Sequence, residues 1–513
     1  MRVALANPPC VIPLGNGLEK YFIRAGSRWP FSVVKPRTQC LCDYLPFPFY
    51  LAYATALLER AGIETCALDA VAMNWDEEQT LAELAARKPD VVVIESTTPT
   101  FGRDQLFFRR LKQELGCRIV VAGAHVTAFP EESLQKCADL DYILLGEYEF
   151  NLQRLCLALR DNPGHPNLAG MKGVGGRQDG QIRLDATKAV IENLDDLPFP
   201  AWHQFPVQGQ ACWNYYWDNI CQLKPAAQMH ASRGCPFHCN FCVWNAVMYD
   251  HRRIRAFSPD RVCDEMEALV RQFGVREIYF DDDNFTGSRS HVHNLCAEIK
   301  RRGLDRAVRW SVMGDVMVCD EPTLEAMADA GCIAMKFGVE SGDEAVLKGI
   351  RKPVNLDKAL RMARRAAQLG IKTHATFSVG LLGETRASMQ KTLDFAQALD
   401  VDTIQISITT PFPGTEFYEQ VKAKGLLTST DWHDFDGQNT AVVRYENLAN
   451  EEIRDFAAAF ATRWLRHKVR QPAWVWRQLK MFLRILRAQG VPGLRRLLQA
   501  GWRVLAHSKR QST

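Results

Sequence analysis

Three closely spaced cysteines have the clearest chemical potential in this chain of 513 residues. Cys235, Cys239 and Cys242 stand in the run Ser-Arg-Gly-Cys-Pro-Phe-His-Cys-Asn-Phe-Cys, with the spacing Cys-x3-Cys-x2-Cys. Three such thiolates can hold three irons of a cubane iron–sulfur cluster. The next cysteine is Cys263, so one iron would keep an open site for a substrate or cofactor. Two alternatives remain: a zinc site completed by His238, or unrelated buried thiols.

The motif, with Phe241 directly before its last cysteine, resembles the signature of the radical S-adenosylmethionine (radical SAM) enzymes. In that family the open iron chelates the methionine moiety of S-adenosylmethionine. An electron from the reduced cluster then releases a 5′-deoxyadenosyl radical, which abstracts hydrogen from unactivated carbon. The resemblance implies a [4Fe-4S] cluster and S-adenosyl-L-methionine as cofactors, while the protein supplies position and excludes water.

Composition sets the outer limits of the prediction. The length predicts two to four domains, and 47% hydrophobic with 24% charged residues is typical of a globular protein. Sixteen cysteines in so long a chain do not suggest a disulfide scaffold, and a cysteine cluster motif needs reduced thiols, so we expect a cytoplasmic setting. The first residues predict a strand rather than a signal peptide, and no stretch of about 18 uncharged apolar residues exists to span a membrane.

Residues 1–150 predict an α/β domain with a doubly wound parallel sheet, because strand and helix patterns alternate. The expected strands are 2–6, 63–68, 90–95, 118–122 and 142–145, and the expected helices are 48–61, 80–87 and 104–115. A long loop with Pro13, Gly15, Gly17 and Pro30 is expected after the first strand. Ligands of such sheets lie beyond the carboxyl ends of the strands.

Small and hydroxyl residues gather at those strand ends, where backbone could approach a large flat ligand. The layout resembles the cobalamin-binding domain fused to one branch of radical SAM enzymes, and implies cobalamin as a third cofactor. The residues that the resemblance assigns to cofactor binding are Asn7, Pro8, Ser96, Thr97, Gly123, His125, Thr127, Gly146 and Glu147.

Many cobalamin proteins supply a histidine to cobalt from an Asp-x-His-x-x-Gly motif, which is absent here. His125 lacks both the Asp and the Gly of that pattern. The resemblance to the radical branch therefore implies that no protein histidine binds cobalt. His125 either lines the site or satisfies its own loop.

The rest of the core predicts a connector over 151–225 and an open (β/α)6 barrel over 226–425. Six strands are expected at 229–232, 277–280, 310–313, 334–339, 373–379 and 403–409, each followed by a polar, Gly- or Pro-containing loop. Chemistry in such barrels is done at the carboxyl ends of the strands.

By the same resemblance, loops after these strands hold S-adenosylmethionine. The assignments are Asp281 and Asp283 for the methionine amino group or the substrate, Glu340 and Ser341 for the ribose or carboxylate, and Gly380, Gly383 and Pro411 beside the adenosine. Carboxylates next to an ammonium or a hydroxyl make charge-assisted hydrogen bonds that fix orientation. Each glycine alone is also explained as a turn former.

Residues 426–513 predict a helical extension whose end carries one sign of charge. From Phe456 onward there is no Asp or Glu and there are 13 Lys or Arg, so the remainder of the chain is net acidic. Between Pro472 and Gln489, basic residues and Trp or Leu recur side by side at helical spacing, and Leu494–Leu505 repeats the theme. Such helices lie in bilayer interfaces with Lys and Arg near anionic headgroups. Docking on the acidic body and nucleic-acid binding are the alternatives, the latter explaining the apolar residues less well.

Together these features predict a cytoplasmic, peripherally membrane-associated enzyme that C-methylates a lipid or lipid-linked substrate. Its expected partners are that substrate, an anionic membrane surface and a reductant protein such as a flavodoxin or ferredoxin, with no nucleic acid. Radical cyclisation or ring-forming oxidation is the alternative within the class. An RNA-modifying methylthiotransferase is less favoured because the N-terminal cysteines show no comparable cluster loop, and a non-catalytic iron–sulfur carrier is the remaining class. The substrate is not specified by the sequence.

Overall fold

The computed structural model describes residues 1–26, 31–37, 44–164, 166–178, 180–207, 216–249, 253–484 and 486–487. The chain divides into two compact units. Unit 1 comprises Met1–Tyr216, Asn240–Arg255 and Pro411–Gly437, and unit 2 comprises Trp217–Cys239, Ala256–Thr410 and the chain from Gln438 onward.

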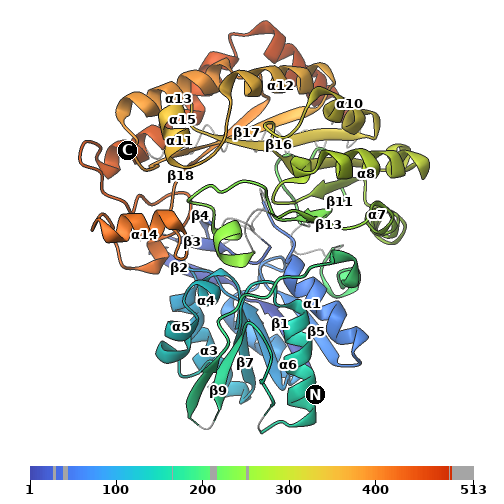
Figure 1. Cartoon of the computed structure of the whole chain (residues 1–513), viewed down its shortest axis with the longest axis vertical. Helices are drawn as coiled ribbons and strands as arrows, with labels where there is room; N and C mark the ends of the chain where they lie inside the picture. The colour runs from blue at the N-terminus through green and yellow to red at the C-terminus, as the bar shows by residue number, and fades with distance from the viewer. Residues whose placement is uncertain are drawn as a thin grey trace. The chain divides into compact units, whose positions relative to one another are not determined.

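Unit 1 is built on a seven-stranded sheet in the order β10-β9-β8-β7-β6-β1-β5 (Figure 1). The strands are β1 (Arg2–Asn7), β5 (Glu64–Asp69), β6 (Val91–Glu95), β7 (Arg118–Ala122), β8 (Tyr142–Leu144), β9 (Val174–Gln178) and β10 (Gln181–Leu184). Five neighbouring strands of this sheet, β5, β1, β6, β7 and β8, run parallel. The central strands are apolar on both sides, as in Val91-Val92-Val93-Ile94, because helices cover both faces. The predicted doubly wound parallel sheet is confirmed.

Helices pack on this sheet from both sides (Figure 1). They are α1 (Phe49–Arg60), α2 (Glu77–Arg87), α3 (Phe101–Leu115), α4 (Ala124–Ala128), α5 (Pro130–Lys136) and α6 (Glu149–Asp161). Helices α1 and α6 contact each other, while α2, α3 and α5 share an apolar core with the strands. The parallel strands therefore end together at one edge, and their loops form a continuous rim.

The segment 151–225 was predicted as a connector, and its first part instead belongs to the sheet. It contributes helix α6 and the antiparallel edge strands β9 and β10. Gly175 and Gly176 both lie within β9, although glycine is more common in turns than in strands. A Cβ at either position would come within 2.9 Å of side-chain atoms, including Leu184 or Tyr142. These glycines are needed for close packing rather than for turning, which is why the sequence pattern misled.

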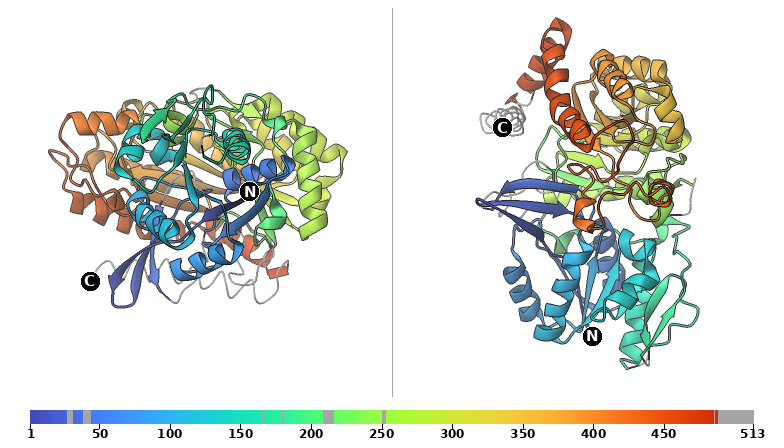
Figure 2. Two further views of the ribbon diagram at one scale, coloured as in Figure 1. Left: turned by 90° about the horizontal axis from the view of Figure 1, so that it is seen from below. Right: turned by 90° about the vertical axis from the view of Figure 1, so that its left-hand side faces the viewer.

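The prediction of a long loop after the first strand is also wrong. Three antiparallel strands, β2 (Cys10–Gly15), β3 (Leu18–Ile23) and β4 (Phe31–Pro36), form a small sheet, seen in blue in Figure 2 as an arm. The β2–β3 turn contains Asn16 and Gly17, both with positive φ, as a tight hairpin requires. Pro13 is compatible with a strand here because β2 is an edge strand.

Unit 2 is the predicted open barrel. Its six parallel strands follow the order β11-β14-β15-β16-β17-β18. Their bounds are β11 (Ala226–Met229), β14 (Glu277–Phe280), β15 (Arg309–Gly314), β16 (Cys332–Glu340), β17 (Lys372–Val379) and β18 (Thr403–Ile408). Helices α7 (Pro259–Phe273), α8 (Arg289–Arg301), α9 (Leu304–Ala307), α10 (Glu321–Asp329), α11 (Glu344–Gly349), α12 (Leu356–Gln368) and α13 (Arg386–Ala398) lie between the strands. The (β/α)6 prediction is confirmed.

The region predicted as a single C-terminal extension is divided between the units. Helix α14 (Glu416–Ala423) and the short helix η5 (Trp432–Asp434) belong to unit 1, whereas α15 (Asn450–Lys468) packs on β18 and α13 of unit 2. Residues 472–484 are helical, and the repeat predicted at 494–505 lies outside the described residues. Among the described helices, none is both long and apolar enough to cross a bilayer.

Candidate functional site

The cysteine loop is shaped by the residues that follow strand β14. Asp282 is fully buried, and its carboxylate accepts hydrogen bonds from the backbone N–H of Ala231 and the hydroxyl of Ser232. Asp283 accepts from the backbone N–H of Gly234 at 2.8 Å. Asp281 and Asp283 were predicted to contact S-adenosylmethionine or the substrate, and this stays a prediction. The carboxylates of Asp282 and Asp283 hold the backbone that leads into the first cysteine, and the neighbouring Asp281 is buried.

The three motif cysteines differ from the other described cysteines in exposure. Cys235, Cys239 and Cys242 are partly exposed, while the other ten described cysteines are buried. Burial raises the pKa of every one of those ten thiols, for example to about 12 at Cys296. The amide of Asn284 points its nitrogen at the sulfur of Cys235, 3.7 Å away. Accessible thiols with a hydrogen-bond donor suit cluster ligands, since such bonds to sulfur tune iron–sulfur clusters.

Cys235 and Cys239 belong to unit 2 and Cys242 to unit 1. In the part of the chain that the structure describes, no group of three or more His, Cys, Asp or Glu side chains already surrounds a metal-sized point. The donor set itself, three partly exposed thiols in one loop, fits an iron–sulfur cluster. A π-helix, η3 (Trp244–Met248), starts two residues after Cys242, and such turns often occur at functional sites.

A buried charge cluster lies at the carboxyl ends of β15 to β17. Glu340 ends β16, and its carboxylate accepts hydrogen bonds from Lys352 at 3.0 Å and from Ser378 at 2.9 Å. Lys352 also lies 3.7 Å from Asp315. Burial alone would lower the pKa of Lys352, but the negative charges of Glu340, Asp315 and Cys239 raise it above its ordinary value. Lys352 is therefore a fixed cation in the neighbourhood of a motif cysteine.

The other residues predicted to hold S-adenosylmethionine lie in loops at the ends of β16, β17 and β18. The hydroxyl of Ser341 lies 3.1 Å from that of Thr392 and accepts from the backbone N–H of Asp343. Gly380 and Gly383 have positive φ, +76° and +80°, so both occupy backbone conformations that favour glycine. Pro411 is buried three residues after the end of β18.

Glu384 closes the loop that contains these two glycines. Its carboxylate accepts hydrogen bonds from the backbone N–H groups of Gly380 and Leu381. Burial outweighs these bonds and raises the pKa of Glu384 to about 7. The sequence prediction named the glycines of this loop but not the carboxylate that holds it.

In unit 1 the predicted cobalamin residues share the rim at the strand ends. Asn7 ends β1 and donates to Asp69 at the end of β5, at 2.9 Å. Tyr216 donates to the same carboxylate, and burial raises the pKa of Asp69 to about 6. The amide oxygen of Asn7 is buried and has no hydrogen-bond partner among the described residues. Corrin rings carry amide side chains that can donate to such an oxygen, so this rim fits the cofactor.

A buried network supports the neighbouring loops. Asp104 accepts hydrogen bonds from Ser96 at 2.6 Å and Thr100 at 2.9 Å, and pairs with the fully buried Arg24 of the arm. Arg24 also donates to the carbonyl of Pro8. The hydroxyl of Thr97 lies 3.2 Å from that of Thr100. Arg24 and Asp104 were missed from the sequence because Arg24 lies in the segment predicted as loop.

Two glycines bring the remaining loops into contact. A Cβ on Gly123 would lie 2.4 Å from the carbonyl of Ser96, and a Cβ on Gly146 would lie 2.4 Å from that of Ala189. The hydroxyl of Thr127 accepts from the backbone N–H of Gly146. Glu147 forms a buried ion pair with Arg255 and accepts from the backbone N–H of Ile191, so its carboxylate is used inside the fold.

His125 lies among aromatic rings. Its imidazole stacks on Phe101 at 4.1 Å between centroids and meets Phe129 and Trp432 edge-on. Burial lowers the pKa of His125 to about 3, so the ring is neutral. Its Nδ1 has no partner among the described residues. His125 was expected either to line the cofactor site or to satisfy its own loop. The aromatic enclosure favours the second role.

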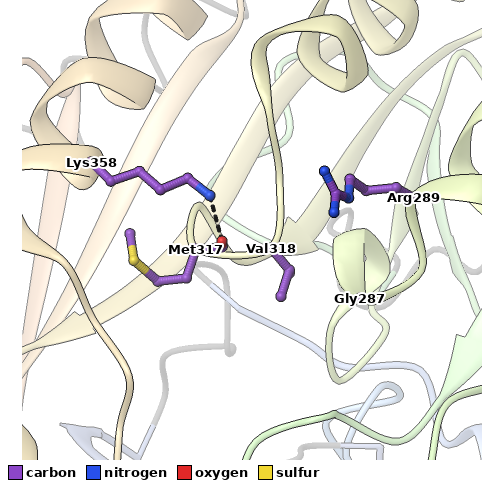
Figure 3. Close-up of a pocket in the computed structure, with 5 residues that line it drawn as sticks. All are labelled: Gly287, Arg289, Met317, Val318 and Lys358. Atoms are coloured by element: carbon purple, nitrogen blue, oxygen red, sulfur yellow. Dashed lines mark hydrogen bonds between the residues drawn. The ribbon is translucent and has the colours of Figure 1, made fainter.

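A separate pocket of about 240 Å³ lies on unit 2 (Figure 3). It is lined by Gly287, Arg289, Met317, Val318 and Lys358. Lys358 donates to the carbonyl of Met317, and Arg289 pairs with Asp320. None of the residues predicted from the sequence lines this pocket.

Comparison with known families identifies both halves of the chain. Residues 229–396 match the radical SAM superfamily, and residues 43–155 match the B12 binding domain. The match to the second family covers helix α1 and the strands from β5 to β8.

Curated relatives share most of the chain length. An uncharacterized methyltransferase of Pyrococcus horikoshii is 29% identical over 425 residues, which is 82% of this chain and 88% of the relative. The anaerobic magnesium-protoporphyrin IX monomethyl ester cyclase of Rubrivivax gelatinosus is 26% identical over 416 residues, 80% of this chain and 72% of the relative. The hopanoid C-3 methylase of Methylococcus capsulatus is 25% identical over 403 residues, 77% and 72% of the two chains.

Solved structures support the same fold. The radical S-adenosylmethionine methyltransferase TsrM of Kitasatospora setae, solved with cobalamin and a [4Fe-4S] cluster, has a TM-score of 0.63 at 21% identity, covering 84% of this chain and 76% of that one. The cobalamin-dependent radical enzyme OxsB has a TM-score of 0.64 at 14% identity, covering 89% and 66%.

Proposed function

Because the chain belongs to the cobalamin-dependent radical S-adenosylmethionine enzymes, we propose that it transfers a methyl group to an unactivated carbon of a lipid or lipid-linked substrate. Its cofactors are a [4Fe-4S] cluster, S-adenosylmethionine and cobalamin. When bound, the first two supply the radical that removes a hydrogen atom from the substrate, and cobalamin supplies the methyl group that replaces it. The single observation that carries the proposal is the pairing of both domains in one chain with the relatives that are named as methyltransferases.

The chain's own residues position and shield these groups. Cys235, Cys239 and Cys242 would hold the cluster, and the Asp282 and Asp283 carboxylates keep their loop in shape. A fixed cation at Lys352, which donates to Glu340, can also attract the carboxylate of S-adenosylmethionine. The rim of unit 1, with the unpartnered oxygen of Asn7, would hold the corrin periphery.

Label transfer tests the proposed reaction. Anaerobically reconstituted protein is incubated with a chemical reductant, methyl-labelled S-adenosylmethionine and an extract of the cells in which the gene is native. Label that becomes carbon-bound in an extracted molecule supports C-methylation. Deoxyadenosine formation without label transfer would contradict methylation and favour the ring-forming oxidation, the reaction that the cyclase relative suggests.

We also propose that the C-terminal helix rests on an anionic membrane surface. One side of this helix is docked on unit 2: the indole of Trp474 donates to the carbonyl of Val401, and Arg477 pairs with Asp400 and Asp402. This side of the helix therefore agrees with the alternative that the C-terminal helix packs on the body of the protein. Figure 2 shows the red segment at the periphery of unit 2.

The other side of the same helix carries exposed apolar and basic residues. Trp476, Leu479 and Leu483 are 58%, 43% and 40% exposed, and Lys480 lies over the Trp476 ring. Trp476, Leu479 and Leu483 are three and four residues apart, so they form one stripe along the helix. Apolar insertion plus attraction to anionic headgroups is the binding mode that this stripe supports. A small electron carrier such as a flavodoxin or ferredoxin completes the proposed set of partners.

A further inference from the structure

The two faces of the barrel sheet differ in polarity. On the face toward the helices, alternate residues such as Val312, Met335, Phe337 and Ala375 are apolar and fully buried. On the opposite, inner face, most of the alternate residues on β16 to β18 are polar and only partly buried. These inner residues are Lys336, Gly338, His374, Thr376, Gln405 and Ser407. An ordinary packed barrel interior is filled by Val, Ile and Leu, so this polarity calls for a cause.

The strand registers gather these residues into layers. Lys336 pairs with His374 and His374 with Thr403, which forms one layer across β16, β17 and β18. In the next layer toward the carboxyl ends, Gly338 pairs with Thr376 and Thr376 with Gln405. Gly338 leaves room above it, because a Cβ there would lie 2.3 Å from the Glu340 carboxylate and 2.9 Å from Nζ of Lys352.

Lys336, the cation of the first layer, is neutralised by a carboxylate near the amino-terminal ends of the strands. Lys336 pairs with Asp218 at 3.2 Å. Asp218 lies in the segment whose residues Ile220 and Cys221 pack against Tyr279 and Ala334. This segment therefore covers the amino-terminal end of the inner face.

His374 keeps one hydrogen-bonding atom unused. Its Nδ1 lies 2.8 Å from the hydroxyl of Thr403, while Nε2 is buried and makes no hydrogen bond of ordinary geometry with the described residues, although the Gln405 side chain lies close enough to act on the ring. Burial, helped by the positive charge of Lys336, lowers the pKa of His374 to about 3, so the ring is neutral. A neutral imidazole has one donor and one acceptor nitrogen, and the Thr403 bond uses only one of them. A buried polar atom without a partner is costly, and a bound ligand would relieve that cost.

We propose that the inner face of β16 to β18 receives a hydrophilic, hydrogen-bonding part of the substrate, and that His374 selects it through Nε2. This inference rests on the proposed function and narrows its substrate class. Lipid-linked molecules with a polar head enter the barrel, whereas a bare hydrocarbon skeleton does not. His374 and Glu340 lie in layers about four residues apart along β16, roughly 13 Å at the rise of a strand. The recognised polar group is therefore separated from the strand ends by about the length of two or three linked sugars or of a short amide chain.

Stimulation of S-adenosylmethionine cleavage tests the class of substrate. The extract is separated into water-soluble, polar-lipid and neutral-lipid fractions, and each is added to reconstituted holoenzyme while deoxyadenosine is measured. Stimulation by the water-soluble or the polar-lipid fraction is expected. Stimulation by neutral lipid alone, or by no fraction, would overturn the inference. Stimulation by the water-soluble fraction alone would remove the lipid from the proposed function and leave the inference standing.

Two variants of one residue separate recognition from structure. In His374→Asn the side-chain amide can still reach Thr403 but leaves nothing at the position of Nε2, whereas in His374→Gln a polar group returns to that position and the Thr403 bond is lost. We expect His374→Asn to need about ten-fold more of the stimulating fraction for half-maximal rate and His374→Gln to need less. The reverse order would mean that His374 acts only through Thr403 and would overturn its selecting role.

Discussion

Glu340 and Lys352 form a buried ion pair of 3.0 Å in which the acidic partner has a backbone φ of +69°. A non-glycine residue in that region is strained, and strain of this kind tends to persist where a side chain must be aimed. The pair directs the Glu340 carboxylate across Gly338 and leaves Lys352 between two carboxylates.

Replacing Lys352 by Met should leave Glu340 and Asp315 as uncompensated buried acids. We expect a loss of about 3–5 kcal/mol in the free energy of unfolding, the usual cost of removing one partner from a buried ion pair. Burial already raises the pKa of Asp315, and Lys352 is the charge that opposes this rise. Without Lys352, protonation of Asp315 favours the folded state of the variant, and the deficit should grow as the pH rises above 5. Denaturant unfolding at pH 5 and pH 8 measures this. Lys391→Met is the matched control and should cost little, because the Lys391 side chain that pairs with Asp343 is itself exposed.

Replacing Cys235, Cys239 and Cys242 together by Ala should abolish the iron–sulfur absorbance near about 400 nm and all deoxyadenosine production, because the cluster loses its ligands. Cys296→Ala removes a buried thiol from helix α8 and should keep both signals. Deoxyadenosine formation by the triple variant would refute the assignment of the cluster.

Cobalamin bound to unit 1 should lack a protein histidine on cobalt. The enclosure of His125 by Phe101, Phe129 and Trp432 supports this. The measurement is electron paramagnetic resonance of the cobalt(II) form in protein whose histidines carry nitrogen-15. A spectrum unchanged by the isotope is expected, and a changed nitrogen splitting would disprove the prediction. Failure of the protein to bind hydroxocobalamin would disprove the domain assignment itself.

Glu384 should make stability depend on pH in one direction. Burial raises its pKa to about 7 from an ordinary value of 4.5. Since the folded-state pKa is the higher one, the stabilisation from its protonated form is complete below pH 4.5 and is lost as the pH rises through 7. Glu384→Gln cannot lose a proton, so its stability relative to wild type should increase by about 2–3 kcal/mol between pH 5 and pH 8. A constant difference over that range, measured by denaturant unfolding, would contradict the shifted pKa.

The exposed stripe of the C-terminal helix should bind anionic vesicles. Changing Trp476, Leu479 and Leu483 to Glu removes the apolar contact and adds repulsion, so sedimentation with anionic vesicles should fall at least ten-fold. Truncation is a poorer test, because Phe460 and Trp464 of α15 are buried in unit 2. Wild-type binding should weaken with added salt but not vanish, since salt screens the charges and not the apolar stripe. Equal binding by the variant would exclude this helix as the anchor, and stronger retention on RNA would favour nucleic acid.

Much of the architecture was predictable from periodicity. Runs such as Val91-Val92-Val93-Ile94 are buried on both sides and allow few other structures, so the parallel strands of both units were found within about two residues, except for β11. The strand predicted at 229–232 lies three residues earlier, at Ala226–Met229. The failures were the arm and the β9–β10 edge. In both, Gly and Pro occur inside strands for reasons of packing and edge position, which no local pattern reveals.

The site was predictable in its loops but not in its partners. The roles of Cys235 and its neighbours depend on local spacing, which the sequence contains. Lys352 and Asn284 act through contacts with Glu340 and Cys235, which come near them only after folding. Glu384 acts by accepting a hydrogen bond from the backbone N–H of Gly380, which the side-chain pattern does not show. The roles assigned to the predicted cofactor residues stay predictions, although several of their side chains, such as those of Ser96, Ser341 and Glu147, already bond within the fold.

The contrast between partly exposed motif thiols and buried thiols elsewhere also determines how the protein behaves once its cluster is gone. Among the described cysteines, the ten buried ones combine poor access with a raised pKa, so they have little thiolate to offer an oxidant or an alkylating reagent. Among the described cysteines, air and maleimides should therefore attack Cys235, Cys239 and Cys242 first. Damage to these described thiols would stay within one loop, and mild reduction followed by fresh iron and sulfide should restore the cluster site without unfolding the protein.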